Sequence, residues 1–153
     1  MKKLTLPLLI FVLFFGCVSN TPNTIMNQTN STTASQNVSF DDSIKVEVYH
    51  FHGTQQCYSC IKVGELAEKT VNTYFKDELA SGKLVFGHIN GELSENQNLV
   101  NRYGVTSSSL WIGTYVNGEF NKEQNINVWY KINNEQEYMD YLKAIIEQKL
   151  ATG

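Results

Sequence analysis

Residues 50–60, HFHGTQQCYSC, join two segments of different periodicity and carry two cysteines at the junction. The stretch that leads into them, Ile44–His52, alternates and is rich in aromatic and β-branched side chains, which predicts a strand. From Cys57 as far as Phe75, apolar residues recur at helical spacing, which predicts a helix that begins near Cys57. We therefore expect a strand followed by a helix, with the pair Cys57 and Cys60 opening the helix.

The sequence after this helix predicts three further strands and two further helices. Asn117-Gly118, between two of these strands, is a dipeptide that two-residue hairpin turns prefer. The expected elements are strands at Lys83–Asn90, at Leu110–Val116 and from Glu119 onward, and helices at Ser94–Tyr103 and Glu135–Leu150. In the order βαβαββα the first two strands are parallel, because a helix crosses between them, and the last two form a hairpin. We expect an α/β domain over residues 44–150, a central mixed sheet flanked by helices, and this element order is similar to that of the thioredoxin fold.

The two cysteines at the start of the helix are suited to disulfide exchange. A thiol at a helix N-terminus lies near unpaired main-chain N–H groups and the positive end of the helix dipole, which lower its pKa from about 8.5. Cys57 is therefore the expected nucleophile. Cys60, one turn later and facing inward, is expected to attack the mixed disulfide and release the partner. A purely structural disulfide is the alternative, but so short a loop stabilises a fold little when it is closed.

A second segment, NLVNRYGVTSSSLWI at residues 98–112, resembles the part of thioredoxins that leads from a helix into the third strand. Thioredoxins keep a cis-proline there, which faces the cysteines and positions the substrate backbone. The resemblance places it at Ser109, next to Ser108, and the prolines of this chain are Pro7 and Pro22. Because a cis bond at a non-proline residue costs about 2.5–4 kcal/mol, we expect a trans bond here and weak general thioredoxin activity.

The missing proline opens an alternative function, because a hydroxyl in its place could leave the thiolates accessible to a metal. His52 lies near the end of the predicted strand and could join Cys57 and Cys60 as a ligand for Cu(I) or zinc. His50 shares the strand face but lies about 6–7 Å further back. Metal binding or delivery through Cys57, Cys60 and His52, or a non-catalytic interaction domain, are therefore the alternatives to a redox function.

A more extensive resemblance is to small secreted or lipoprotein thioredoxin-like proteins of the ArsF family, named as a nitrophenyl compound nitroreductase subunit. The residues that carry it are YHFHGTQQCYSC (49–60), Glu65, Glu95-Asn96, VTSSSL (105–110) and NVWYKINNEQEYMDYLKAII (127–146). It implies a redox partner protein rather than a complete nitroreductase, because the sequence has no GxGxxG fingerprint for flavin or nicotinamide. We therefore expect no cofactor, and as partner another extracytoplasmic thiol or disulfide protein.

The N-terminal residues have the features of an export signal. Two lysines precede the largely apolar stretch Leu4–Phe15, which is shorter than the roughly 20 residues that span a membrane. Gly16-Cys17 follows, and a small residue before a cysteine resembles the lipobox of prokaryotic lipoproteins, in which the leader is cut and the cysteine receives a lipid. We expect residues 1–17 to be a signal peptide with a lipobox-like end. A lipid on Cys17 then anchors the domain to the membrane outside the cytoplasm, with secretion as the alternative.

Residues 18–43 have a composition unlike that of the domain. Ser, Thr, Asn or Gln occupy 17 of these 26 positions, which leaves little to bury and predicts a disordered tether. The N-x-S/T sequons of the chain, at Asn27, Asn30 and Asn37, all fall within this tether. In a host that glycosylates, sugars would be attached there.

Length and charge limit the remaining function classes. With 153 residues, the chain has room for one domain besides the leader and the tether. The formal net charge is −3 and no run of Lys or Arg occurs, so a basic surface for phosphate groups is not expected. Nucleic acid is therefore excluded as an expected partner.

Overall fold

The computed structural model describes residues 45–152. The predicted signal peptide, the lipidation site Cys17 and the sequons at Asn27, Asn30 and Asn37 lie outside these residues. Within the described part of the chain, no helix is both long enough and apolar enough to cross a membrane.

The described residues form strands and helices in the order predicted from the sequence, with two additions. A short helix follows the long one after a break at Phe75, and a 3-10 turn precedes the last helix. The elements are β1 (Lys45–His52), α1 (Tyr58–Tyr74), α2 (Lys76–Ser81), β2 (Leu84–Asn90), η1 (Ser94–Asn96), α3 (Gln97–Tyr103), β3 (Ser109–Val116), β4 (Glu119–Gln124), η2 (Asn127–Tyr130) and α4 (Glu135–Ala151). The additions are α2 and η2.

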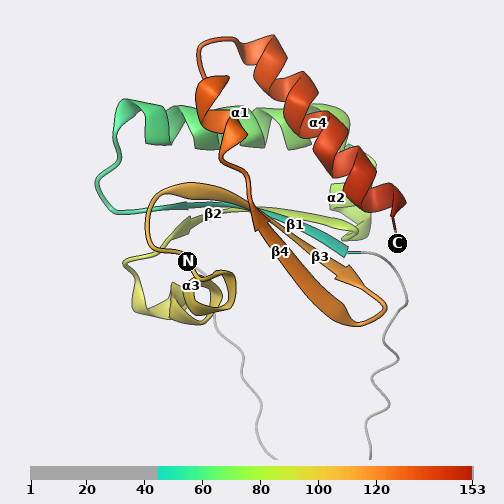
Figure 1. The fold of residues 1–153 in the computed structure, drawn as a ribbon, viewed down its shortest axis with the longest axis horizontal. Helices are drawn as coiled ribbons and strands as arrows, with labels where there is room; N and C mark the ends of the chain where they lie inside the picture. Colours follow the sequence, from blue (N-terminus) through green and yellow to red (C-terminus); the bar gives the residue numbers. More distant parts are fainter. Residues whose placement is uncertain (1–44, 153) are drawn as a thin grey trace, which may run out of the picture. The chain divides into compact units, whose positions relative to one another are not determined.

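The strands form one mixed sheet in the order β2-β1-β3-β4 (Figure 1). β1 is parallel to β2 and antiparallel to β3, where Phe51 lies opposite Ser109. The β3–β4 hairpin turns at Asn117 and Gly118, whose positive φ angles of 52° and 79° are the conformation that this dipeptide favours. This strand order, with a helical crossover between the parallel pair, is a thioredoxin-like α/β fold. The predicted fold class is confirmed.

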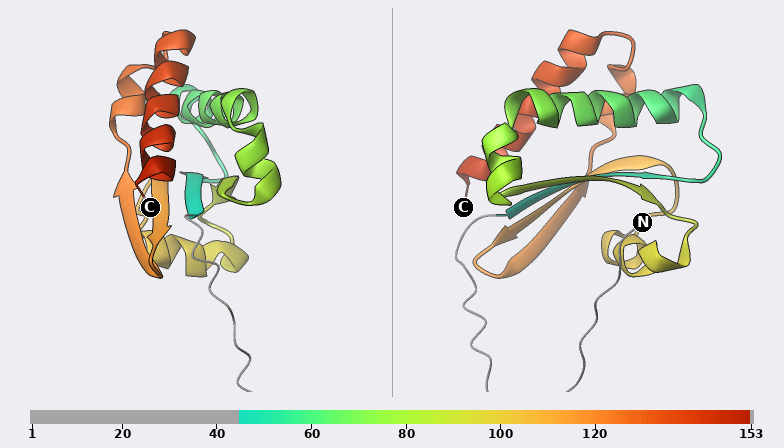
Figure 2. Two further views of the ribbon diagram at one scale, coloured as in Figure 1. Left: turned by 90° about the vertical axis from the view of Figure 1, so that its right-hand side faces the viewer. Right: turned by 180° about the vertical axis from the view of Figure 1, so that it is seen from behind.

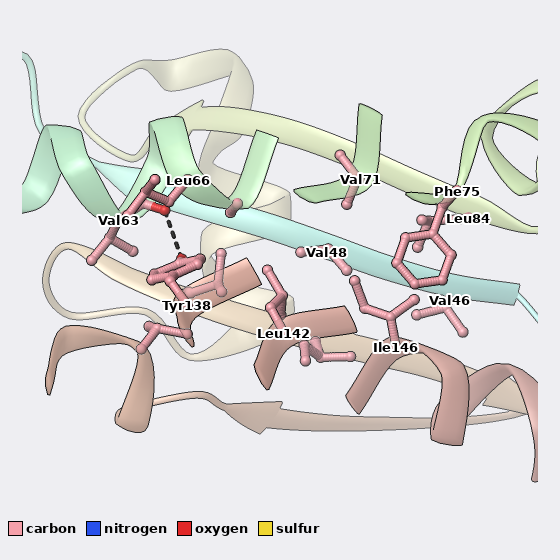
Figure 3. Packing of buried hydrophobic residues seen from close by; sticks show 14 residues of the cluster. Val46, Val48, Val63, Leu66, Val71, Phe75, Leu84, Tyr138, Leu142 and Ile146 are labelled. Carbon is pink, nitrogen blue, oxygen red and sulfur yellow. Dashed lines mark hydrogen bonds between the residues drawn. The ribbon is translucent and has the colours of Figure 1, made fainter. Parts of the chain in front are cut away.

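The helices cover the two faces of the sheet unequally, with α1 and α4 on one face and α3 on the other (Figures 1 and 2). The main core lies under α1 and α4, where Val46 and Val48 of β1 meet the apolar stripes of both helices (Figure 3). Tyr138 of α4 is buried in this layer, and its hydroxyl donates to the carbonyl oxygen of Val63 in α1 at 2.7 Å. This bond joins α4 to the first turns of α1 and so holds the start of that helix in place.

On the opposite face, a buried carboxylate ties α3 to the sheet. Glu47 of β1 is only 2% exposed and accepts hydrogen bonds from the Arg102 guanidinium at 2.7 Å and the Tyr103 hydroxyl at 2.8 Å. Burial, reinforced by the hydrogen bond to Glu47, raises the pKa of Tyr103, so its hydroxyl keeps the proton that it donates. Since α3 ends at Tyr103, this network sets the path of the loop at residues 104–108, which leads into β3.

Candidate redox site

Cys57 and Cys60 form a disulfide at the start of α1, with their Cα atoms 5.1 Å apart. Cys57 is the N-cap of the helix, in an extended conformation with φ −75° and ψ 163°. Its Sγ accepts a hydrogen bond from the main-chain N–H of Cys60 at 3.2 Å. Cys57 is exposed and Cys60 is half-buried. The structure thus brings the two predicted cysteines together and places the predicted nucleophile where a partner can reach it.

The N-terminus of α1 favours a negative charge on Cys57 Sγ. The helix has 17 residues, and its first turn contains no acidic side chain that would oppose such a charge. Glu65, which lies further along the helix, forms an ion pair with Lys62, with Nζ 2.7 Å from Oε2, so the positive charge of Lys62 lies beside its carboxylate. When the disulfide is reduced, the unpaired N–H groups and the helix dipole therefore stabilise the thiolate of Cys57 relative to its thiol. The thiolate is the form that attacks a disulfide.

The turn that leads into Cys57 is held by a carboxylate that the sequence did not single out. Glu92, just after β2, accepts a hydrogen bond from the main-chain N–H of Thr54 at 3.1 Å, and the side-chain amide of Asn90 donates to the Thr54 hydroxyl at 3.1 Å. Hydrogen bonding to Thr54 lowers the pKa of Glu92, so the carboxylate stays ionised at neutral pH. These bonds tie the turn after β1 to the turn after β2.

The loop that would carry a cis-proline in thioredoxins is closed by the side chain of Ser109. This residue is 2% exposed, and its hydroxyl donates to the Ser107 carbonyl oxygen at 2.8 Å and accepts from the Trp111 indole N–H at 3.0 Å. Peptide bonds throughout residues 45–152 are trans, as expected without a proline in the loop. The Ser109 hydroxyl is therefore engaged within its own loop and strand.

The neighbouring Ser108 lines a cavity of about 270 Å³ at the C-terminal end of β1. Its walls are the end of β1, the turn around Glu92, one side chain of α3 and the loop at residues 105–108. They combine hydroxyl groups, a carboxylate and apolar side chains. Because His52 and Gly53 belong to the wall and begin the turn toward the cysteines, the cavity adjoins that turn.

All three histidines of the chain meet on the sheet face beneath α1. His50 is 1% exposed, its Nδ1 lies 3.0 Å from Nδ1 of His88 in β2, and the ring of His52 stacks on it with centroids 5.4 Å apart. Burial, followed by the neighbouring His88 and His52, lowers the pKa of His50 to about 4, so this ring is neutral at pH 7. The sequence did not indicate that His88 joins the other two, because this depends on the parallel pairing of β1 and β2.

Gly64 of α1 makes room for the histidine rings. A Cβ at position 64 would lie 2.7 Å from Cε1 of His50 and 2.9 Å from Cε1 of His88, closer than packed carbon atoms approach. A glycine inside a helix costs about 1 kcal/mol relative to alanine, and the space taken by these rings accounts for it here. Cys60 lies four residues earlier and therefore on the same face of α1. An inward-facing glycine is the sequence feature that could have indicated this cluster.

The alternative metal site is not assembled in this structure. His52, the predicted third ligand, uses Nδ1 to donate to the carbonyl oxygen of Gly53 at 2.9 Å. Among residues 45–152, no group of three or more His, Cys, Asp or Glu side chains is arranged to hold a metal ion. The set Cys57, Cys60 and His52 therefore has no support from the geometry of the disulfide form.

Solved structures with thioredoxin-like folds are similar to this chain. The Trx4 domain of ERdj5 aligns with a TM-score of 0.49 and 17% identity over 71% of this chain and 82% of that chain. A thioredoxin of Plasmodium falciparum aligns with a TM-score of 0.34 and 18% identity over 69% of this chain and 81% of that chain. No family model matches the sequence, and no curated protein matches it. Strand order and the disulfide at the start of α1 give the described residues a thioredoxin-like fold with a CxxC pair.

Proposed function

We propose that this protein exchanges disulfides with another thiol or disulfide protein outside the cytoplasm, through Cys57 and Cys60. The observation that carries the proposal is the position of Cys57 Sγ at the N-terminus of α1, where it accepts the N–H of Cys60. A thiolate at this position is stabilised and exposed, which are the two properties of a reactive cysteine. The second thiol lies within bonding reach of the same sulfur, so a mixed disulfide can be resolved within the protein.

The exchange moves two electrons between two dithiol–disulfide pairs. In the reducing direction, the Cys57 thiolate attacks one sulfur of the partner's disulfide, the partner's S–S bond breaks, and the leaving sulfur takes up a proton. Cys60 then loses its proton and attacks Cys57 Sγ. The mixed disulfide breaks, the partner leaves as a dithiol, and the Cys57–Cys60 disulfide is formed. The reverse sequence oxidises a dithiol of the partner.

The surface around Cys57 supports a polypeptide partner. Tyr58 is 70% exposed and Ile61 is 41% exposed, and both lie in the first turn of α1 beside the cysteines. Exposed apolar side chains next to a reactive sulfur favour contact with another protein over reaction with a small hydrophilic oxidant. The resemblance to the ArsF family, which stays a prediction, implies the same role of a redox partner protein.

The reduction potential of the Cys57–Cys60 pair tests the proposed function. We expect a reversible two-electron couple between about −120 and −270 mV, the range of proteins that exchange disulfides. The protein is equilibrated against glutathione or dithiothreitol buffers, with and without Cu(I), and its oxidised fraction is measured. A disulfide that stays oxidised in buffers poised below about −300 mV would be a structural bond instead. Tight capture of Cu(I) by the reduced form would favour metal delivery.

Membrane attachment through Cys17 is part of the same proposal and is supported by the lipobox-like residues before it. We expect the protein to partition with membranes. The substitution Cys17→Ser should move it to the soluble fraction or block its processing, because serine has no thiol to which the lipid can be attached. Cys57→Ser is the matched control and should leave membrane partition unchanged. Fractionation followed by mass spectrometry of the N-terminus measures both. If Cys17→Ser is processed and partitions like the unaltered protein, the lipid anchor is wrong.

A further inference from the structure

The cavity at the C-terminal end of β1 has the size of a site for one side chain. Its volume of about 270 Å³ lies just below the range of about 300 to 1,000 Å³ that is typical of pockets for drug-sized molecules. Part of its wall is apolar and consists of Phe51, Val100 and Val105. Such a wall can cover a short hydrocarbon chain. The exchange reaction described above does not use this cavity.

The charge of the wall is negative. Its titratable residues are His52 and Glu92, and it contains no lysine or arginine. Glu92 is exposed, and its hydrogen bonds to Thr54 lower its pKa, so the carboxylate is ionised at neutral pH. None of the ion pairs within residues 45–152 includes Glu92. The charge of this carboxylate therefore favours a cation in the cavity.

A glycine holds the carboxylate of Glu92 at the wall. Oε2 accepts the N–H of Thr54 at 3.1 Å, and Oε1 lies over Gly53, where a Cβ would be only 2.7 Å away. Non-bonded atoms do not approach so closely, so a side chain at position 53 would push the carboxylate aside. Because Oε2 is bonded to the turn, Oε1 is the oxygen that can accept a hydrogen bond from a ligand.

The loop before β3 adds hydroxyl groups to the same wall, at Thr106, Ser107 and Ser108. An ammonium group has three N–H donors, which a carboxylate oxygen and hydroxyl oxygens can accept, and the methylene chain of lysine can lie along apolar side chains. The planar fork of arginine instead fits both oxygens of a carboxylate, and one oxygen of Glu92 is already in use. Lysine therefore matches this wall better than arginine does.

The cavity is close enough to Cys57 to contact a polypeptide that reacts there. Gly53 in the wall precedes Cys57 by four residues, so their Cα atoms are at most about 14 Å apart. An extended peptide advances about 3.3 Å per residue, and four residues cover about 13 Å. A partner whose cysteine is bonded to Cys57 can thus reach the cavity with a side chain up to about four residues away.

We propose that this cavity binds a lysine side chain of the partner protein, within about four residues of the partner's reactive cysteine. The proposal rests on the proposed exchange function and names the kind of partner. The ammonium group lies at Glu92 Oε1 and the hydroxyls of the loop, and the methylene chain lies against Phe51, Val100 and Val105. Partners with a lysine beside their disulfide are selected, and partners with an acidic residue there are disfavoured.

The test measures how fast peptides with and without a lysine react. The full chain carrying Cys17→Ser is reduced and mixed with short peptides, each with one cysteine bonded to a coloured aromatic thiol. Attack by Cys57 on the peptide sulfur releases the coloured thiolate. One position, moved from four residues before the cysteine to four after it, carries lysine or its uncharged analogue norleucine. At one position or more we expect the lysine peptide to react at least about fivefold faster at low salt, and the ratio to fall in about 0.5 M salt.

Three variants show whether the ratio of the two rates depends on the cavity. Glu92→Gln removes the charge but keeps an oxygen that can accept the N–H of Thr54, and the ratio should fall to within about twofold of 1. Thr106→Lys, at an exposed position of the wall, supplies an ammonium group from the protein itself and should lower the ratio as well. It keeps the test valid if Glu92→Gln does not fold. Glu95→Gln is the matched control, because it removes an exposed carboxylate outside the wall, and it should retain the ratio.

The lysine site and the exchange function fail in different ways. A ratio near 1 at every position in the unaltered protein overturns the lysine site. The same holds for a ratio that is unchanged in both Glu92→Gln and Thr106→Lys, or lost equally in Glu95→Gln. If every peptide reacts as slowly as it does with free cysteine, the exchange function itself is refuted.

Discussion

We expect the replacement of Cys57 by serine to lower the rate at which the reduced protein reacts with glutathione disulfide by more than about 1000-fold. A serine hydroxyl is not ionised near neutral pH, and the remaining Cys60 is half-buried within the first turn of α1. The rate is measured on the reduced chain with Cys17→Ser, as the appearance of the mixed disulfide by mass spectrometry between pH 5 and pH 9. In the unaltered pair, the rate should level off at a lower pH than that of free cysteine, whose pKa is about 8.5, because the helix N-terminus stabilises the Cys57 thiolate.

Cys60→Ser is the matched control for this prediction. It retains Cys57 at the N-cap, together with the main-chain N–H at position 60 that bonds to its sulfur. We therefore expect the mixed disulfide to form within about threefold of the normal rate and then to accumulate, because no second thiol releases the partner. Equal slowing in Cys57→Ser and Cys60→Ser would show that helix position does not select the nucleophile.

The free energy of unfolding should fall by as much as about 3 kcal/mol between pH 6.5 and pH 4 because of His50 alone. In the folded protein the pKa of His50 is lowered to about 4, mainly by burial, from the ordinary value of 6.5. Between these two values the unfolded chain binds a proton at this position and the folded protein does not. Stability from this group is therefore complete above pH 6.5 and is lost as the pH falls toward 4. Urea unfolding at a series of pH values measures it.

The variant His50→Gln isolates this contribution, because glutamine does not titrate. Its free energy of unfolding should depend less on pH between 6.5 and 4 than that of the unaltered protein, whatever its stability at pH 7. His52→Gln changes the adjacent ring, which is not fully buried, and should retain the steep dependence. Equal pH dependence in the unaltered protein and His50→Gln would contradict the neutral, buried state of this histidine.

Most of the fold followed from local patterns of the sequence. The alternation that ends at His52 and the helical spacing after Cys57 involve near neighbours, so β1 and α1 formed as predicted. The hairpin turn at Asn117 and Gly118 is also a local preference of the backbone. The sequence did not predict α2 or η2, which have 6 and 4 residues. Segments this short complete too few turns for a periodic pattern to appear.

The disulfide could also be predicted from local sequence. Two cysteines separated by two residues at a helix start lie within reach of each other whatever the rest of the fold, so their pairing could be predicted from spacing. The loop at Ser109 could be located by resemblance. Its hydrogen bonds to Ser107 and Trp111 became evident only in three dimensions.

Contacts between distant segments were decided by the tertiary structure alone. His88 meets His50 across 38 residues, and Glu92 meets Thr54 across the same separation, because β1 and β2 pair in parallel with a particular register. That register depends on burial of a whole sheet face, which no single segment encodes. The sequence by itself thus determined which two cysteines form the disulfide, whereas packing of α1 against the sheet, with Gly64 at the contact, determined that His50 and His88 meet beneath that helix.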